Sequence, residues 1–250
     1  MERRPAASSL TWEELRDAAD GGAVALLPVG STEAHGPHLP LHTDVVIAEE
    51  VADRARRLLE EAGKRAIVLP PLAYGVTEFA KGFSGTVSIG ASTLEALVID
   101  IAASLHGQGL SPLVLVNHHL EPEHFAALHR AAASAAARAA PARVIVPDHR
   151  KKPWALELGE EFCRGGSHAG SYETSLMLAA APGEVRAARE ALEPFHLDLG
   201  KAIKGGATSF LELGGDRAYF GDPAAASAAE GNALFDKLAR HVAALVLSAE

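Results

Sequence analysis

Two short segments of the chain combine carboxylate and imidazole side chains at close spacing. The first is Gly-Ser-Thr-Glu-Ala-His-Gly-Pro-His at residues 30–38, followed by Asp44, and the second is Asn-His-His-Leu-Glu at residues 117–121. Carboxylates and imidazoles without a thiolate suit Zn, Mn or Fe(II). The sequence therefore predicts a metal-dependent enzyme.

The spacing within each segment favours a shared metal site. Glu33 and His35 are two residues apart, as are His119 and Glu121, and this spacing in extended chain directs both side chains to one side. Asp44, at the start of a predicted helix, is a fifth candidate ligand that could bridge two ions. Five ligands exceed what one tetrahedral zinc requires, so the set favours a pair of metals that activates a water molecule.

Each of these residues also has a structural explanation when it is taken alone. Asp44 can cap the helix that it precedes, and Glu33 and His35 can be exposed loop residues. His119 can be a buried histidine whose hydrogen bonds are satisfied. Motif matches of this kind carry a high false-positive risk, and only elements that bring the residues together would make a metal site.

Apolar runs alternate with amphipathic stretches along the chain. The runs predict buried strands at residues 23–28, 66–69, 113–116 and 143–146. Helices are predicted at residues 12–19, 44–62, 92–106, 122–140, 173–181 and 224–250, the first and third opened by capping boxes, Thr11 with Glu14 and Ser92 with Glu95. Such alternation predicts a three-layer α/β/α sandwich with a mostly parallel sheet.

The predicted fold brings the two segments together. They follow the first and third strands, and ligands in open α/β sheets bind outside the carboxyl ends of the strands. The Gly- and Ser-rich residues 74–90 are expected to form a functional loop, and residues 148–170, where periodicity weakens, an extended active-site segment.

Composition limits the class of protein. A chain of 250 residues is compatible with one α/β domain, residues 1–250. The formal charge of −9 argues against a nucleic-acid partner. No apolar run approaches the roughly 20 residues of a bilayer span, so no membrane association is expected. The single cysteine, Cys163, is expected to be an ordinary thiol and suits a reducing, cytoplasmic compartment.

Four motifs resemble the creatininase family of metal-dependent amidohydrolases. Residues 27–40 with Thr43 and Asp44 resemble its N-terminal signature, and residues 83–86 resemble its Gly-Thr loop. Residues 117–121 resemble its central metal motif, and residues 168–175 its C-terminal signature. The first motif is highly specific, and the motifs occur in the family's order.

The resemblance implies two divalent metal ions per chain, Zn and/or Mn, with Fe also possible. One ion would be held by Glu33, Asp44 and His119, and the other by His35, Asp44 and Glu121. A water between two cations has its pKa lowered toward neutrality and becomes a nucleophilic hydroxide. The resemblance also implies a homo-oligomer, a hexamer in this family.

Two further residues are catalytic candidates by the same resemblance. His168 is the candidate general acid for the departing nitrogen. Glu173 could orient His168 or a metal ligand, or it could be a carboxylate stabilised by the dipole at a helix N-terminus.

The departures from the family concern the substrate. Creatininase has an aromatic residue where this chain has Leu120, and a Trp-Asp pair where this chain has Arg164-Gly165, while His118 stands where the family usually has glycine. We therefore expect hydrolysis of a non-peptide C–N bond of a small molecule, a cyclic amide or formamide, with creatinine itself in doubt. The alternatives are a peptidase that trims a short modified peptide and a noncatalytic metal-binding protein.

Overall fold

The computed structural model describes residues 7–138, 141–165 and 168–248, and its centre is a parallel sheet. The strands are β1 (Val24–Val29), β2 (Ala66–Val68), β3 (Leu113–Asn117) and β4 (Val144–Ile145), in the spatial order β2-β1-β3-β4. All three strand pairs are parallel, and β1 has the longest pairing, with β3. The four predicted strands and their parallel arrangement are confirmed.

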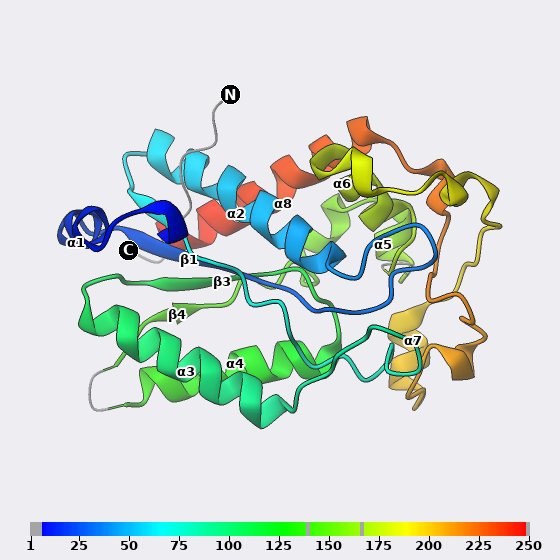
Figure 1. Ribbon diagram of the computed structural model, residues 1–250, viewed down its shortest axis with the longest axis horizontal. Helices are drawn as coiled ribbons and strands as arrows, with labels where there is room; N and C mark the ends of the chain where they lie inside the picture. Colours follow the sequence, from blue (N-terminus) through cyan, green and yellow to red (C-terminus); the bar gives the residue numbers. More distant parts are fainter. Residues whose placement is uncertain (1–6, 139–140, 166–167, 249–250) are drawn as a thin grey trace.

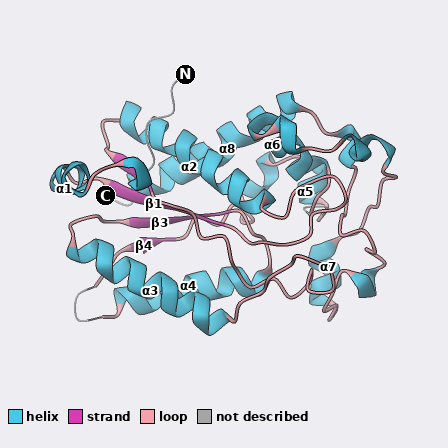
Figure 2. Cartoon of the chain, viewed as in Figure 1, coloured by secondary structure: helices cyan, strands magenta, loops and turns pink. Residues whose placement is uncertain are grey.

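Helices cover both faces of the sheet (Figures 1 and 2). On one face lie α2 (Thr43–Glu61), α6 (Ser171–Ala180) and α8 (Ala228–Ser248), and on the other lie α3 (Ala91–Gly107) and α4 (Pro122–Ala136). Alternate strand residues supply two separate cores: Leu26 and Val114 pack toward α2 and α8, whereas Leu27 and Leu115 pack toward α3 and α4. The predicted three-layer α/β/α sandwich is confirmed.

Helix α1 (Trp12–Asp20) begins with the predicted capping box, since Thr11 and Glu14 bond reciprocally. The second predicted capping box is wrong. Helix α3 begins at Ala91 after Gly90, which lacks a side-chain cap, and Ser92 therefore lies inside the first turn. Glu95 instead accepts a hydrogen bond from Arg130 of α4. The predicted ends of the fourth and last helices, at residues 140 and 250, lie outside the described residues.

The segment after β4 is more helical than its weak periodicity predicted. It contains a 3-10 helix at Trp154–Glu157 and the short α5 (Glu160–Cys163). Helix α7 (Leu199–Lys204), which we did not predict, is capped by Asp198, whose side chain accepts the Lys201 amide hydrogen. Further 3-10 turns lie at Ala7–Ser9, Pro182–Glu184, Ala187–Ala191, Leu211–Leu213 and Pro223–Ala225.

None of the helices that the structure describes combines the length and apolar character needed to cross a membrane.

Candidate metal centre

The candidate ligands gather at the carboxyl ends of β1 and β3, where the N-terminus of α2 meets the sheet. Gly30, immediately after β1, makes this approach possible. A Cβ atom at position 30 would lie 2.7 Å from the Val45 nitrogen and 2.8 Å from the Asp44 Cβ, closer than packed atoms come. The absence of a side chain at position 30 thus lets Asp44, in the first turn of α2, face the loops that follow the two strands.

One group of ligand atoms comes from Glu33, Asp44 and His119. The Nδ1 atom of His119 lies 3.3 Å from Glu33 Oε1 and 3.0 Å from Asp44 Oδ2. All three side chains are buried, and their ligand atoms lie close enough together to hold one ion. This is the first of the two predicted ligand sets.

A second group is formed by His35, Asp44 and Glu173. The Nε2 atom of His35 lies 3.2 Å from Asp44 Oδ1 and 3.5 Å from Glu173 Oε2. Asp44 therefore presents one oxygen to each imidazole, Oδ1 to His35 and Oδ2 to His119, which is the geometry of a bridging carboxylate. These atoms also lie within reach of one ion.

Glu121, predicted as a ligand of the second metal, is not in this group. Its carboxylate accepts hydrogen bonds from the backbone nitrogens of Glu78, at 3.1 Å, and Phe79, at 3.3 Å. Burial raises the pKa of Glu121, and the nearby His119 only partly offsets this effect. The structure thus brings Glu173 from α6, and not Glu121, to His35 and Asp44.

His168 completes the cluster on its outer side. Its Nδ1 atom lies 3.7 Å from Glu33 Oε1, and its ring packs between those of His35 and Phe210, each at 4.5 Å between centroids. Burial, followed by the charge of His35, lowers the pKa of His168, so its imidazole is neutral at pH 7. This neutral imidazole faces the carboxylates.

The hydrogen bonds of the three imidazoles fix which nitrogen carries a proton. His35 Nδ1, His119 Nε2 and His168 Nε2 lie 3.1, 2.8 and 2.9 Å from backbone carbonyl oxygens, which can only accept. In the neutral rings the other nitrogen of each then directs a lone pair at the carboxylates. Metal-binding histidines are oriented in this way. The buried His35 Nε2 has no hydrogen-bond partner among the described residues.

Hydrogen bonds from neighbouring residues also orient the carboxylates. The Thr77 hydroxyl donates to Glu33, the Ser31 nitrogen donates to Asp44 at 3.2 Å, and the Ala169 nitrogen donates to Glu173 at 2.6 Å. Thr77 and its neighbours belong to the loop 74–90 that the sequence marked as functional, although its hydroxyl contact with Glu33 was not predicted.

The buried carboxylates of the cluster are balanced by positive charge on the imidazoles. Burial opposes the ionisation of Glu33 and Asp44, yet the imidazoles beside them lower the pKa of both carboxyls. Burial disfavours a charged His35. The nearby carboxylates of Asp44 and Glu173 outweigh this effect and raise the pKa of His35 to about 10. Protons on the imidazoles thus stabilise the metal-free site. Each of these protons sits on an imidazole nitrogen that faces carboxylate oxygens. A divalent metal ion would bind the same nitrogen and oxygen atoms in place of the proton, so the donor set fits such ions.

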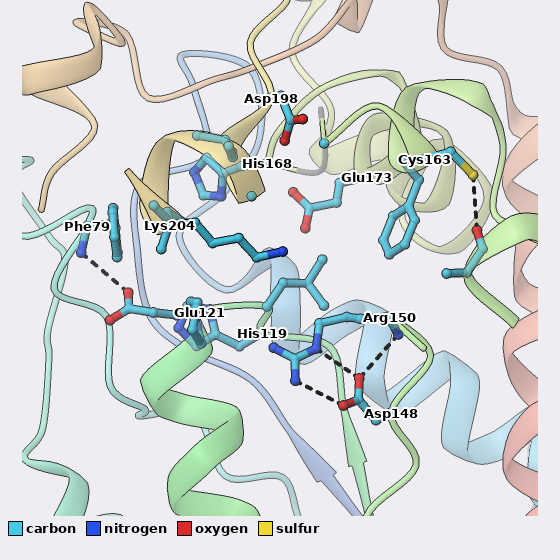
Figure 3. A pocket seen from close by; sticks show the side chains of 18 of the residues that line it. Phe79, His119, Glu121, Asp148, Arg150, Cys163, His168, Glu173, Asp198 and Lys204 are labelled. Atoms are coloured by element: carbon cyan, nitrogen blue, oxygen red, sulfur yellow. Dashed lines mark hydrogen bonds and ion pairs between the residues drawn. The ribbon is translucent and has the colours of Figure 1, made fainter. Parts of the chain in front are cut away.

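A cavity of about 730 Å³ opens at the cluster. Figure 3 shows His119, His168 and Glu173 around it, with Lys204 of α7 extending across. The side chains of α7 and of residues 148–156 form its outer wall. Lys204 was not predicted as a site residue, because neither its type nor its spacing distinguishes it from a surface lysine.

Comparison with known proteins identifies the family of this chain. Residues 8–246 match the family model described as Creatininase: Creatinine amidohydrolase. The mycofactocin precursor peptide peptidase of Mycolicibacterium smegmatis is 34% identical over 86% of this chain and 81% of its own length. The creatinine amidohydrolase of Pseudomonas putida is 36% identical over 69% of this chain and 70% of its own.

A solved structure of a creatininase variant of the Zn-Zn type has the same fold. It is 25% identical, covers 98% of this chain and 99% of its own, and has a TM-score of 0.72. The relatives are named amidohydrolase and peptidase, and both names describe hydrolysis of an amide C–N bond. The chain therefore belongs to the creatininase family and is a hydrolase of amide C–N bonds.

Proposed function

We propose that this protein is a dinuclear metal-dependent amidohydrolase, with residues 1–250 forming one catalytic domain. The observation that carries the proposal is Asp44, whose two carboxylate oxygens each face a different imidazole nitrogen. A carboxylate that served only to pair with one histidine, or to cap α2, would not need both contacts.

The distances among the described residues allow three ligand sets; Glu33, His35 and His168 form one of them, and we propose the two that share Asp44. Glu33, Asp44 and His119 would hold one ion, and His35, Asp44 and Glu173 the other. The second set differs from the sequence-based one because Glu173 takes the place of Glu121. Bound divalent ions would lower the pKa of a water molecule and polarise the amide carbonyl. Nitrogen and oxygen ligands suit Zn or Mn, with Fe as the alternative.

Proton transfer would then be carried out by side chains of the protein. His168 is neutral and directs its Nδ1 lone pair into the cluster, because its Nε2 proton is engaged with the Ala34 carbonyl oxygen. It can accept a proton as the nucleophile forms and donate one to the nitrogen of the departing amine. Thr77 and the Ser31 nitrogen keep Glu33 and Asp44 oriented throughout.

The size of the cavity bears on the substrate. A volume of about 730 Å³ is in the range of sites for drug-sized ligands, several times that of a single small ring. A short modified peptide, the alternative in the sequence-based analysis, therefore fits better than a small cyclic amide. The relatives named peptidase also match more of the chain than the creatinine amidohydrolase does. A cyclic amide or formamide is the second candidate, favoured by the creatininase name of the solved neighbour.

Metal analysis and a substrate panel test the proposal. Protein purified without chelator should contain about two equivalents of Zn, Mn or Fe per chain, and should hydrolyse an amide from a panel of lactams, formamides, short peptides and creatinine. Protein that contains no metal and binds none on titration would contradict the dinuclear proposal. Rapid turnover of creatinine would favour the second substrate class. The homo-oligomer and the cytoplasmic location stay predictions.

A further inference from the structure

The outer wall of the cavity carries positive charge, although the chain as a whole has a formal charge of −9. Four cationic side chains line the cavity. Arg150, Lys151 and Lys152 precede the 3-10 helix at Trp154–Glu157, and Lys204 ends α7. The cations thus come from two elements that are distant in sequence and face one cavity.

Two of these cations already have partners. Arg150 forms a double contact with Asp148, at 2.8 and 3.0 Å, and stacks on the Phe125 ring at 3.4 Å. The Lys151 ammonium lies 3.6 Å from the same carboxylate. Lys152 and Lys204 are exposed and form no ion pair with any residue of the described ranges. In Figure 3 the Lys204 side chain extends from α7 across the cavity, on the side where His168 and Glu173 lie.

The carboxylates of the cavity do not offset these two ammonium groups by contact. Glu121 accepts hydrogen bonds from the backbone nitrogens of Glu78 and Phe79. Asp198 accepts the amide hydrogen of Lys201 at the start of α7. Glu33, Asp44 and Glu173 belong to the cluster and would be balanced by two divalent ions. The ammonium group of Lys204 can therefore pair with an anionic group in the cavity.

Apolar side chains line the remainder of the cavity. They include Leu120 beside His119, Phe162 of α5, Ile203 of α7 and Phe210. A ligand that filled the cavity would present an apolar body to these side chains, a polar amide to the cluster and an anionic group to the lysines. Sites of this kind combine apolar walls with a few placed polar groups that fix orientation.

We propose that the substrate carries a carboxylate on an apolar body next to the scissile amide, and that Lys204 is the specificity residue that binds it. The inference rests on the proposed amide hydrolysis and narrows its substrate class to N-acylated apolar amino acids and short peptides with a free, apolar C-terminal residue. Lys152, which lines the same cavity, adds a second positive charge.

The test compares binding of N-acetyl-phenylalanine and of its carboxamide to the Mn-loaded protein by calorimetry. The two probes have nearly the same shape and differ at one end, where a neutral carboxamide replaces the carboxylate. Wild type should bind the acid about five- to tenfold more tightly, the range of one partly exposed charged contact. Lys204→Gln should abolish this preference, and Lys204→Glu should reverse it. Lys201→Gln is the matched control, since Lys201 lies on the same helix but does not line the cavity.

Several outcomes overturn the inference. Equal binding of both probes to wild type, no measurable binding of the acid, or a preference that survives in Lys204→Gln would each show that Lys204 does not select the anion. The last result would place the carboxylate on the metals. Metal content is measured on the same samples, so a failure of the dinuclear proposal appears as missing metal, separately from the loss of the acid preference.

Discussion

Replacing Glu173 by glutamine should remove one of the two proposed metal ions. The side chain is 2% exposed, and its carboxylate lies 3.5 Å from His35 Nε2 and 3.6 Å from His118 Nε2. Glutamine keeps the shape but removes the charge. Removing one partner of a buried charged contact costs about 3 to 5 kcal/mol, which is about two to four powers of ten in Kd.

The matched variant is Glu121→Gln, which makes the same chemical change in the same cavity. Its carboxylate accepts hydrogen bonds from Glu78 and Phe79 and lies outside the candidate ligand groups, so metal content should stay near two equivalents. Elemental analysis after dialysis, together with competition against a chelator, gives stoichiometry and Kd for both variants.

A metal-free readout is also available. Burial disfavours a charged His35, whereas Asp44 and then Glu173 favour it and raise its pKa to about 10. Glu173→Gln should therefore lower the pKa of His35 in the chelated protein, as measured by NMR titration, and Glu121→Gln should leave it unchanged. If Glu121→Gln loses one ion while Glu173→Gln keeps both, the ligand set drawn from the distances is wrong.

Three further outcomes are expected. Asp44→Asn should weaken the binding of both ions and abolish turnover, because each oxygen of Asp44 faces one imidazole. Full metal content in this variant would contradict a bridging role of Asp44. Burial lowers the pKa of His241 to about 4, so its contribution to the free energy of unfolding should be present above pH 6.5 and lost as the pH falls toward 4. Urea titrations should show that His241→Gln flattens this dependence. Ile47→Ala, at a fully buried position of α2, should lower the free energy of unfolding by about 2 to 5 kcal/mol in the same assay.

The local sequence pattern was sufficient to predict the sheet and part of the ligand cluster. The apolar runs before Gly30 and Asn117 predicted β1 and β3, and the rule that ligands meet at carboxyl strand ends placed Glu33, His35 and His119 together. Asp44 was included among the candidate ligands because a helix was predicted to begin at this residue. Each of these inferences uses residues close in sequence to a strand end, where backbone geometry decides side-chain direction.

Contacts across long sequence separations were not predictable in this way. Glu173 and His35 are far apart in sequence, and only the packing of α6 against α2 brings them together. Lys204 ends a helix of six residues, too short for a periodic signal. The Ser92 capping box failed for a related reason, since a pattern of two residues does not fix where a helix begins when packing of α3 against α4 sets its position.

The position of Glu121, away from His35 and Asp44, has a physical basis in the loop 74–90. For Glu121 to reach the cluster it would give up the hydrogen bonds from Glu78 and Phe79, each with a net value of about 0.5 to 1.5 kcal/mol, and would leave two backbone donors to be satisfied elsewhere. Glu173 loses no hydrogen bond in its position beside His35, because its Oε2 atom accepts the Ala169 amide hydrogen and also faces His35. The loop therefore holds Glu121 in the wall of the cavity, and Glu173 of α6 is the carboxylate that lies beside His35.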